Sequence, residues 1–152
     1  MHKHLRRLEE VWVEPQIYLV TVCATQRQAV LATDAMAAQI VRGLRETSER
    51  TGWRVGRYVS MPDHVHFFCA PGTQQVSLSD FVGTWKCRTT RLAWRIGHKG
   101  RLWQREFFDH LLRNGESCGD KWSYVVANPV RTGLCERPEE WPYQGELVAL
   151  EW

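Results

Sequence analysis

The sequence lacks a long apolar segment and a disulfide framework. No stretch approaches the ~20 consecutive apolar residues that span a bilayer. Residues 1–7 are charged with no apolar stretch after them, unlike a secretory signal peptide. The five cysteines are odd in number, widely scattered and never spaced as C-x-x-C. We therefore expect reduced thiols and a cytoplasmic protein.

Acidic residues are missing from residues 85–105, although the net charge of the whole chain is only +3. The basic residues of that stretch are Lys86, Arg88, Arg91, Arg95, Lys99, Arg101 and Arg105. Clustered charge of one sign is typical of a protein that binds a polyanion. A solvated helix face produces the same pattern, so charge alone leaves both interpretations open.

The chain, at 152 residues and 43% hydrophobic content, predicts one domain with a real core. We expect that domain to begin with a polar arm (1–15) and to end with a tail (135–152). Hydrophobic patterns and turn signals predict strands at 17–24, 53–60, 64–70 and within 102–112, with helices between Thr33 and Gly52, at 77–96 and at 116–127. This β-α-β-β-α-β order, followed by a helix, indicates a ferredoxin-like (split βαβ) α+β fold, an antiparallel sheet with helices on one face.

His64 and His66 flank Val65 in a segment that is typical of a buried strand. Side chains alternate along a strand, so the two imidazoles share one face, an arrangement that suits a metal ion. Cys69 falls on the opposite face, and the H-E-x-x-H and zinc deaminase signatures are absent. A mixed nitrogen–oxygen site for Mg²⁺ or Mn²⁺ with open positions remains. Histidines held in the core by hydrogen bonds give the same pattern.

Tyr124 and Asn128 form a second candidate pair, because residues four apart share a helix face. A tyrosine hydroxyl becomes a useful nucleophile beside a metal-polarised phosphodiester, and an amide oxygen is a suitable ligand for a hard cation. A core tyrosine and an asparagine that ends a helix before Pro129 explain the same residues. Asp63 either orients the imidazole of His64 or is a turn residue.

Three ordered motifs resemble the single-tyrosine HUH transposases, in particular the REP-associated tyrosine transposases of bacteria. They are MPDHVH at 61–66, WQREFFDHLLR at 103–113 and YVVANPVRTGL at 124–134. The resemblance implies that Tyr124 is the nucleophile, and that His64, His66 and Asn128 bind Mg²⁺ or Mn²⁺. It also implies a ferredoxin-like core with an added helix that carries the tyrosine, and a bacterial, nucleoid-associated protein.

The implied substrate is single-stranded DNA with a guide tetranucleotide next to a hairpin, as in repetitive extragenic palindromes (REPs). The implied reaction forms a 5′-phosphotyrosine and frees a 3′-hydroxyl, so strands can be joined again without ATP. We expect DNA contacts from the arm, the basic helix and the central motif, namely Arg6, Arg7, Lys86, Arg88, Arg91, Arg95, Trp103, Arg105 and Arg113. A monomer is expected, with a homodimer as the other option.

Two other functions fit part of the pattern. A hairpin-binding module that does not cut needs the basic stripe but not the combination of His64, His66, Tyr124 and Asn128. A metal-dependent hydrolase of small phosphoesters needs the histidine pair, predicts turnover without a covalent adduct, and leaves the basic stripe unexplained.

Overall fold

A five-stranded antiparallel sheet forms the middle layer of the protein, which we describe from a computed structural model covering residues 16–113 and 115–151. The strand order is β4-β1-β3-β2-β5. The strands are β1 (Ile17–Cys23), β2 (Arg54–Ser60), β3 (His64–Ala70), β4 (Phe108–Leu112) and β5 (Gln144–Glu146). No helix in the described part of the chain is long and apolar enough to cross a membrane.

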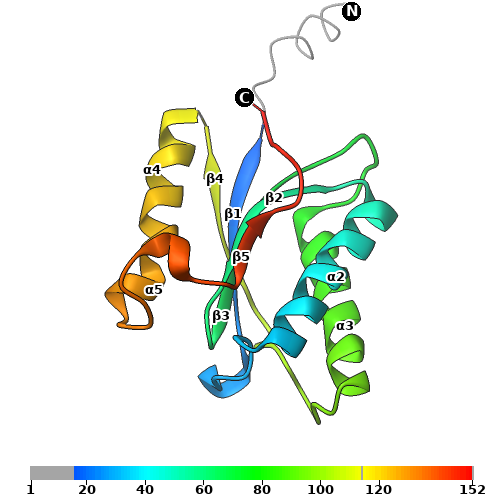
Figure 1. Ribbon diagram of the computed structural model, residues 1–152. Helices are drawn as coiled ribbons and strands as arrows, with labels where there is room; N and C mark the ends of the chain where they lie inside the picture. The colour runs from blue at the N-terminus through cyan, green and yellow to red at the C-terminus, as the bar shows by residue number, and fades with distance from the viewer. Residues whose placement is uncertain (1–15, 114, 152) are drawn as a thin grey trace, which may run out of the picture.

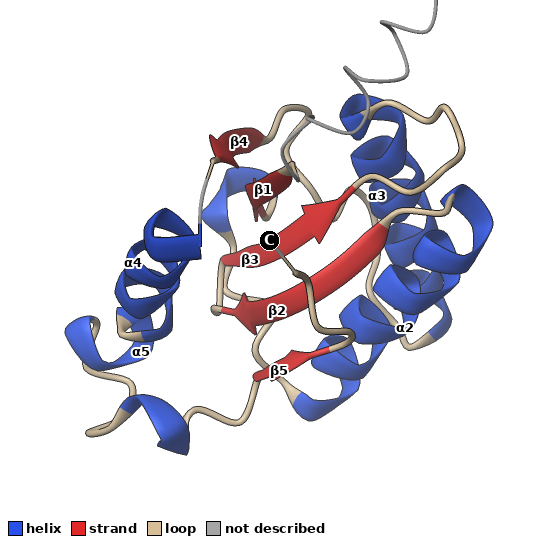
Figure 2. Ribbon diagram, turned by 90° about the horizontal axis from the view of Figure 1, so that it is seen from above, coloured by secondary structure: helices blue, strands red, loops and turns tan. Residues whose placement is uncertain are grey.

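Helices cover both faces of the sheet (Figure 1). The helices are α2 (Asp34–Thr51), α3 (Leu78–Arg95), α4 (Gly115–Val126) and α5 (Asn128–Arg131), with short 3₁₀ turns η1 (Thr25–Arg27) and η2 (Pro138–Glu140). The long α2 and α3 lie together on one face, while α4 and α5 lie on the other (Figures 1 and 2). This is the predicted α+β arrangement, with an added helix that carries Tyr124.

Local sequence signals set the ends of the long helices. The hydroxyl of Thr33 accepts a hydrogen bond from the Met36 amide at 3.1 Å, which caps α2. Gly52 ends the same helix with a φ of 83°, a left-handed conformation that favours glycine. Ser77 caps α3 in the same way by accepting from the Asp80 amide at 3.0 Å. These caps confirm the predicted positions of both helices.

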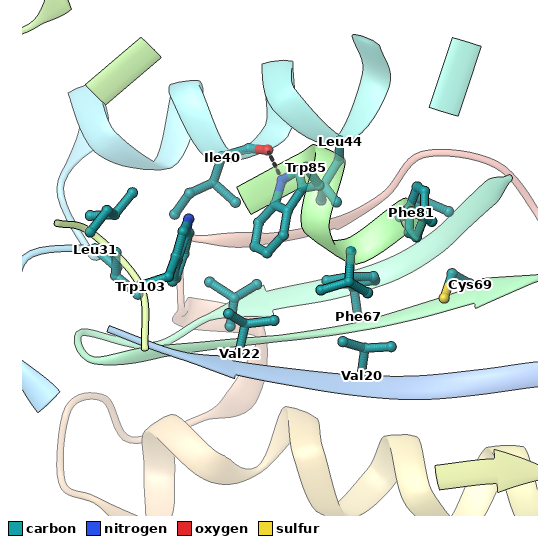
Figure 3. Close-up of a cluster of buried hydrophobic side chains, with 14 of the residues drawn as sticks. Val20, Val22, Leu31, Ile40, Leu44, Phe67, Cys69, Phe81, Trp85 and Trp103 are labelled. Carbon is teal, nitrogen blue, oxygen red and sulfur yellow. Dashed lines mark hydrogen bonds between the residues drawn. The ribbon is translucent and has the colours of Figure 1, made fainter. Parts of the chain in front are cut away.

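The main core lies between the sheet and helices α2 and α3 (Figure 3). Phe67 of β3 meets Phe81 and Trp85 of α3 edge-on, with ring centroids 6.2 and 5.4 Å apart. Trp103 packs against Trp85 at 4.9 Å and is only 3% exposed. Core side chains therefore already cover the ring of Trp103, which leaves little of it exposed for the DNA contact that the sequence predicts.

Three elements differ from the sequence prediction. In the region 102–112 only Phe108–Leu112 is a strand, because residues 102–104 instead bond to the end of β1 and its following turn. Helix α4 ends at Val126, and the chain then resumes as α5 with Pro129 in its first turn, where a proline costs no hydrogen bond. The tail adds the short edge strand β5 beside β2, which was not predicted.

Candidate active site

The two histidines lie side by side on the face of β3 that α4 covers. Val65 and Phe67 point into the core beneath α2 and α3, whereas Phe68 on the opposite face packs against Trp122 of α4. His64 and His66 share that opposite face, with ring centroids 4.7 Å apart and planes at 82°. The predicted pairing of the imidazoles is confirmed.

Hydrogen bonds to Nδ1 orient both imidazoles. His64 Nδ1 lies 2.7 Å from Asp63 Oδ1, and His66 Nδ1 lies 2.8 Å from the hydroxyl oxygen of Thr21, its partner across the β1–β3 ladder. Asp63 in turn accepts a hydrogen bond from Arg27 Nε at 2.9 Å. With Nδ1 engaged, Nε2 is the nitrogen that each ring can offer to a ligand.

Local electrostatics favour a neutral His66. Burial, followed by the nearby His64 and Arg131, lowers the pKa of His66 from 6.5 to about 4. His66 is therefore neutral near pH 7, the state in which an imidazole binds a cation. Burial alone would raise the pKa of Asp63, but hydrogen bonds from His64 and Arg27 outweigh it and lower that pKa. Asp63 thus stays a carboxylate that orients a neighbouring ring rather than only a turn residue.

Asn128 reaches the histidine pair from the start of α5. Its Nδ2 lies 3.3 Å from His64 Nε2, and its Oδ1 accepts a hydrogen bond from Arg131 at 3.2 Å. A half-turn of the amide exchanges these two atoms, which presents the oxygen to the histidines and gives up the hydrogen bond from Arg131. Within residues 16–113 and 115–151, no group of three or more His, Cys, Asp or Glu gathers to hold a metal. A cation at this place would therefore bind two imidazoles and one amide.

Tyr124 lies on the exposed face of α4, with 67% of its surface accessible. The alternative that Tyr124 is a core residue is therefore excluded. The guanidinium of Arg131 stacks 3.9 Å from the centre of the Tyr124 ring and also donates to the Tyr124 carbonyl at 2.8 Å. Because Arg131 also holds Asn128, it connects the two residues that the sequence had paired.

Sequence reasoning missed Arg131 as a part of this site. Arg131 lies within the 124–134 motif, but the resemblance gave it no role, and the remaining signal was its spacing, three residues after Asn128 and seven after Tyr124. A single arginine at helical spacing is common on solvated surfaces, so the spacing alone indicates no role. Thr21 was missed for a different reason, since its contact with His66 depends on the pairing of two strands far apart in sequence.

The predicted DNA-contacting residues fall into different environments. Arg88 donates to Glu46 of α2 at 2.6 Å, so an acidic side chain neutralises the charge of Arg88. Residues 85–105 contain no acidic residue, but the fold brings one beside them from another helix. Lys86 donates to the backbone carbonyl of Arg105 at 2.7 Å. The remaining predicted cations that the structure describes are exposed, namely Arg91, Arg95, Arg105 and Arg113. Arg6 and Arg7 lie outside the described residues.

Comparison with known proteins identifies a family and two curated bacterial relatives. The family described as "Transposase IS200 like" matches residues 13–118. A REP-associated tyrosine transposase of Haemophilus influenzae is 24% identical over 153 residues, covering 90% of this chain and 86% of the relative. A REP-associated tyrosine transposase of Escherichia coli is 25% identical over 91 residues, covering 60% of this chain and 53% of the relative.

Solved structures share the fold. A REP-associated tyrosine transposase bound to a REP hairpin aligns with a TM-score of 0.74 at 20% identity, over 87% of this chain and 77% of that one. The crystal structure of a transposase from Deinococcus radiodurans aligns with a TM-score of 0.58 at 23% identity, over 77% and 92%. These alignments confirm the predicted α+β architecture.

Proposed function

Because the chain belongs to the IS200-like transposase family, we propose that it cuts and rejoins single-stranded DNA beside REP-type hairpins through a covalent bond to Tyr124. The convergence of His64, His66 and Asn128 on one face of β3, with Tyr124 joined to them through Arg131, is the observation that supports the proposal most directly. A binding module that does not cut DNA has no use for this combination.

The donor set fits a divalent cation. His64 and His66 offer Nε2 atoms from neighbouring rings, and Asn128 can add an amide oxygen. Three protein ligands leave positions for phosphate oxygens and water, as Mg²⁺ and Mn²⁺ prefer. When bound, the cation would offset the negative charge that develops on the scissile phosphate.

The reaction that we propose begins with the Tyr124 oxygen, which attacks the phosphorus in line and loses its proton to water. The bond from phosphorus to the 3′-oxygen breaks, and that oxygen takes up a proton. The products are a 5′-phosphotyrosine and a free 3′-hydroxyl. Attack of this hydroxyl, or of one from another strand, on the phosphotyrosine restores the diester and releases Tyr124. One diester bond is exchanged for another, so no nucleotide cofactor is consumed.

The partner that we propose is a DNA hairpin with a single-stranded guide tetranucleotide, on the bacterial chromosome. The printed names of the curated relatives refer to REP sequences, and one structural neighbour was solved with a REP hairpin. Within the described residues one chain supplies the histidines, Asn128 and Tyr124 together. This arrangement supports a monomer rather than a homodimer that exchanges its tyrosine helices.

The test is to incubate the protein with an end-labelled single-stranded REP hairpin in Mn²⁺ or in EDTA, followed by a denaturing gel. We expect a metal-dependent protein–DNA adduct with wild-type protein and none with Tyr124→Phe. Tyr143→Phe is the matched control, because the Tyr143 hydroxyl bonds to Asp34 at the start of α2 and takes no part in the proposed chemistry.

The Tyr124→Phe protein should still bind the hairpin, since phenylalanine keeps the aromatic ring under Arg131. Undiminished cutting by Tyr124→Phe would overturn the assignment of the nucleophile. Tight binding across a panel of hairpins, without cleavage or adduct in either Mg²⁺ or Mn²⁺, would instead favour the binding module.

A further inference from the structure

A groove runs between helix α3 and residues 101–105, away from the face that carries the histidines. We propose that it binds one unpaired nucleotide of single-stranded DNA, with the base stacked on Trp94 and the phosphate held by the surrounding cations. These cations are Lys86, Arg91, Arg101 and Arg105. The inference rests on the proposed function only in taking DNA as the partner.

The size and charge of the groove suit a nucleotide. Its volume is about 400 Å³, within the roughly 300–1,000 Å³ that small-ligand sites occupy. No acidic side chain lines it, and the ion pairs found among the described residues include none of its four cations. Burial, and then the nearby Arg101, lowers the pKa of Lys86. A phosphate among these groups would relieve this repulsion.

Trp94 supplies a stacking surface that is already held in place. It is 52% exposed, yet its indole N–H donates to the Gly100 carbonyl at 2.8 Å, which fixes one edge of the ring against the loop after α3. A base that stacks on a fixed ring loses little affinity to ordering the side chain. Trp103 is different, because it lies buried against Trp85 at the inner wall of the groove.

The groove lies at the same end of the sheet as the histidine pair. The Thr25 amide donates to the Leu102 carbonyl and the Gln104 amide to the Cys23 carbonyl, both at 2.9 Å. Cys23 is the partner of His64 in the β1–β3 ladder. The end of α3 and the start of β3 both lie toward the lower end of the molecule in Figure 1. A single strand can therefore continue from the histidine pair around this edge to Trp94.

An unpaired nucleotide fits this groove better than a duplex stem does. A stem presents its phosphates outward and keeps its bases stacked inside, so it would engage the cations but leave Trp94 unused. An unpaired base exposes a ring face that an aromatic side chain can cover, whatever the base. The combination of a fixed, exposed indole and uncompensated cations therefore selects single-stranded DNA.

The test is equilibrium binding by fluorescence anisotropy, in EDTA so that no cutting occurs. The probes are a labelled REP hairpin with a single-stranded flank and the same hairpin with blunt ends. We expect Trp94→Ala to weaken binding of the flanked hairpin about 5- to 150-fold, with the blunt hairpin unchanged. Trp94→Phe should restore most of the loss. Val148→Ala, which removes an apolar side chain that is 45% exposed in the tail beside Val55 of β2, is the control and should change neither.

A second variant tests the phosphate contact. Arg91→Ala should weaken binding of the flanked hairpin. It should also lower the slope of log affinity against log salt concentration by about one, as expected for the loss of one phosphate contact. The inference is overturned if Trp94→Ala changes neither affinity, if it weakens both hairpins equally, or if the wild-type protein does not prefer the flanked hairpin. This outcome is separable from that of the proposed function. If the protein forms the Tyr124 adduct but does not prefer the flanked hairpin, only the proposed nucleotide site in the groove is rejected. If it prefers the flanked hairpin but forms no adduct, only the proposed nuclease activity is rejected.

Discussion

Replacing Thr21 by valine tests whether the hydrogen bond that orients His66 is needed for metal binding. Thr21 lies directly opposite His66 in the sheet, with Oγ1 at 2.8 Å from Nδ1. The tautomer that keeps Nε2 free for a cation carries its proton on Nδ1 and donates it to Thr21. Valine has nearly the same shape and suits a strand equally well, but it cannot accept this proton.

The size of the effect follows from the burial of the ring. In the variant, the metal-binding tautomer leaves a poorly solvated Nδ1–H without a partner, which costs about 1–3 kcal/mol. The other tautomer avoids that cost, but it places the proton on the nitrogen that should bind the cation. Both routes weaken binding, and loss of such an orienting partner typically lowers metal affinity about 10- to 100-fold.

The assay is calorimetric titration of metal-free protein with Mn²⁺. We expect Thr21→Val to raise the Kd about 10- to 100-fold and Thr21→Ser, which keeps the hydroxyl, to stay near the wild-type value. Thermal unfolding in EDTA should give similar midpoints for the three proteins, which shows that the fold is retained. A Thr21→Val protein that binds Mn²⁺ as tightly as the wild type would refute the reasoning.

Two further predictions concern the same site. Because the pKa of His66 is about 4 when folded and near 6.5 otherwise, the unfolded chain binds an extra proton between these values. Stability in EDTA should therefore fall as the pH drops from about 6.5 to 4, and urea denaturation should show a weaker pH dependence for His66→Gln. Arg131→Ala removes the stacking on the Tyr124 ring and the hydrogen bond to the Tyr124 carbonyl, so adduct formation should slow by about tenfold or more. Arg131→Lys should be intermediate, and an unchanged rate would contradict a positioning role for Arg131.

The parts of the fold that short-range signals determine were predictable. The caps at Thr33 and Ser77 and the stop at Gly52 each act within a few residues, and all three lie where the sequence placed them. Strand β5 carries no such signal. It has three residues and includes Gly145, where a Cβ atom would lie 2.8 Å from the hydroxyl oxygen of Tyr58, so its position depends on tertiary packing against β2.

The candidate site also has parts that short-range signals predict and parts that depend on tertiary packing. Alternation along one strand is enough to put His64 and His66 on a common face, and the structure confirms it. The environments of Arg88 and Trp103 could not be read from the sequence, because each depends on a partner distant along the chain. Glu46 neutralises Arg88 from a different helix, and Trp85 covers the ring of Trp103. The assignments of nucleophile and metal ligands remain predictions.

The register of strand β3 is constrained, because side chains on both of its faces make specific contacts. Val65, Phe67 and Cys69 face the main core, while the two histidines and Phe68 face α4. Inserting or deleting one residue in the preceding turn would exchange the faces, burying imidazoles in the core and presenting aliphatic groups where the histidines lie. A change in the length of that turn should therefore abolish both folding of the core and the pairing of the two imidazoles. The length of the segment that leads into β3 is thus constrained twice, by the packing of the core and by the candidate site.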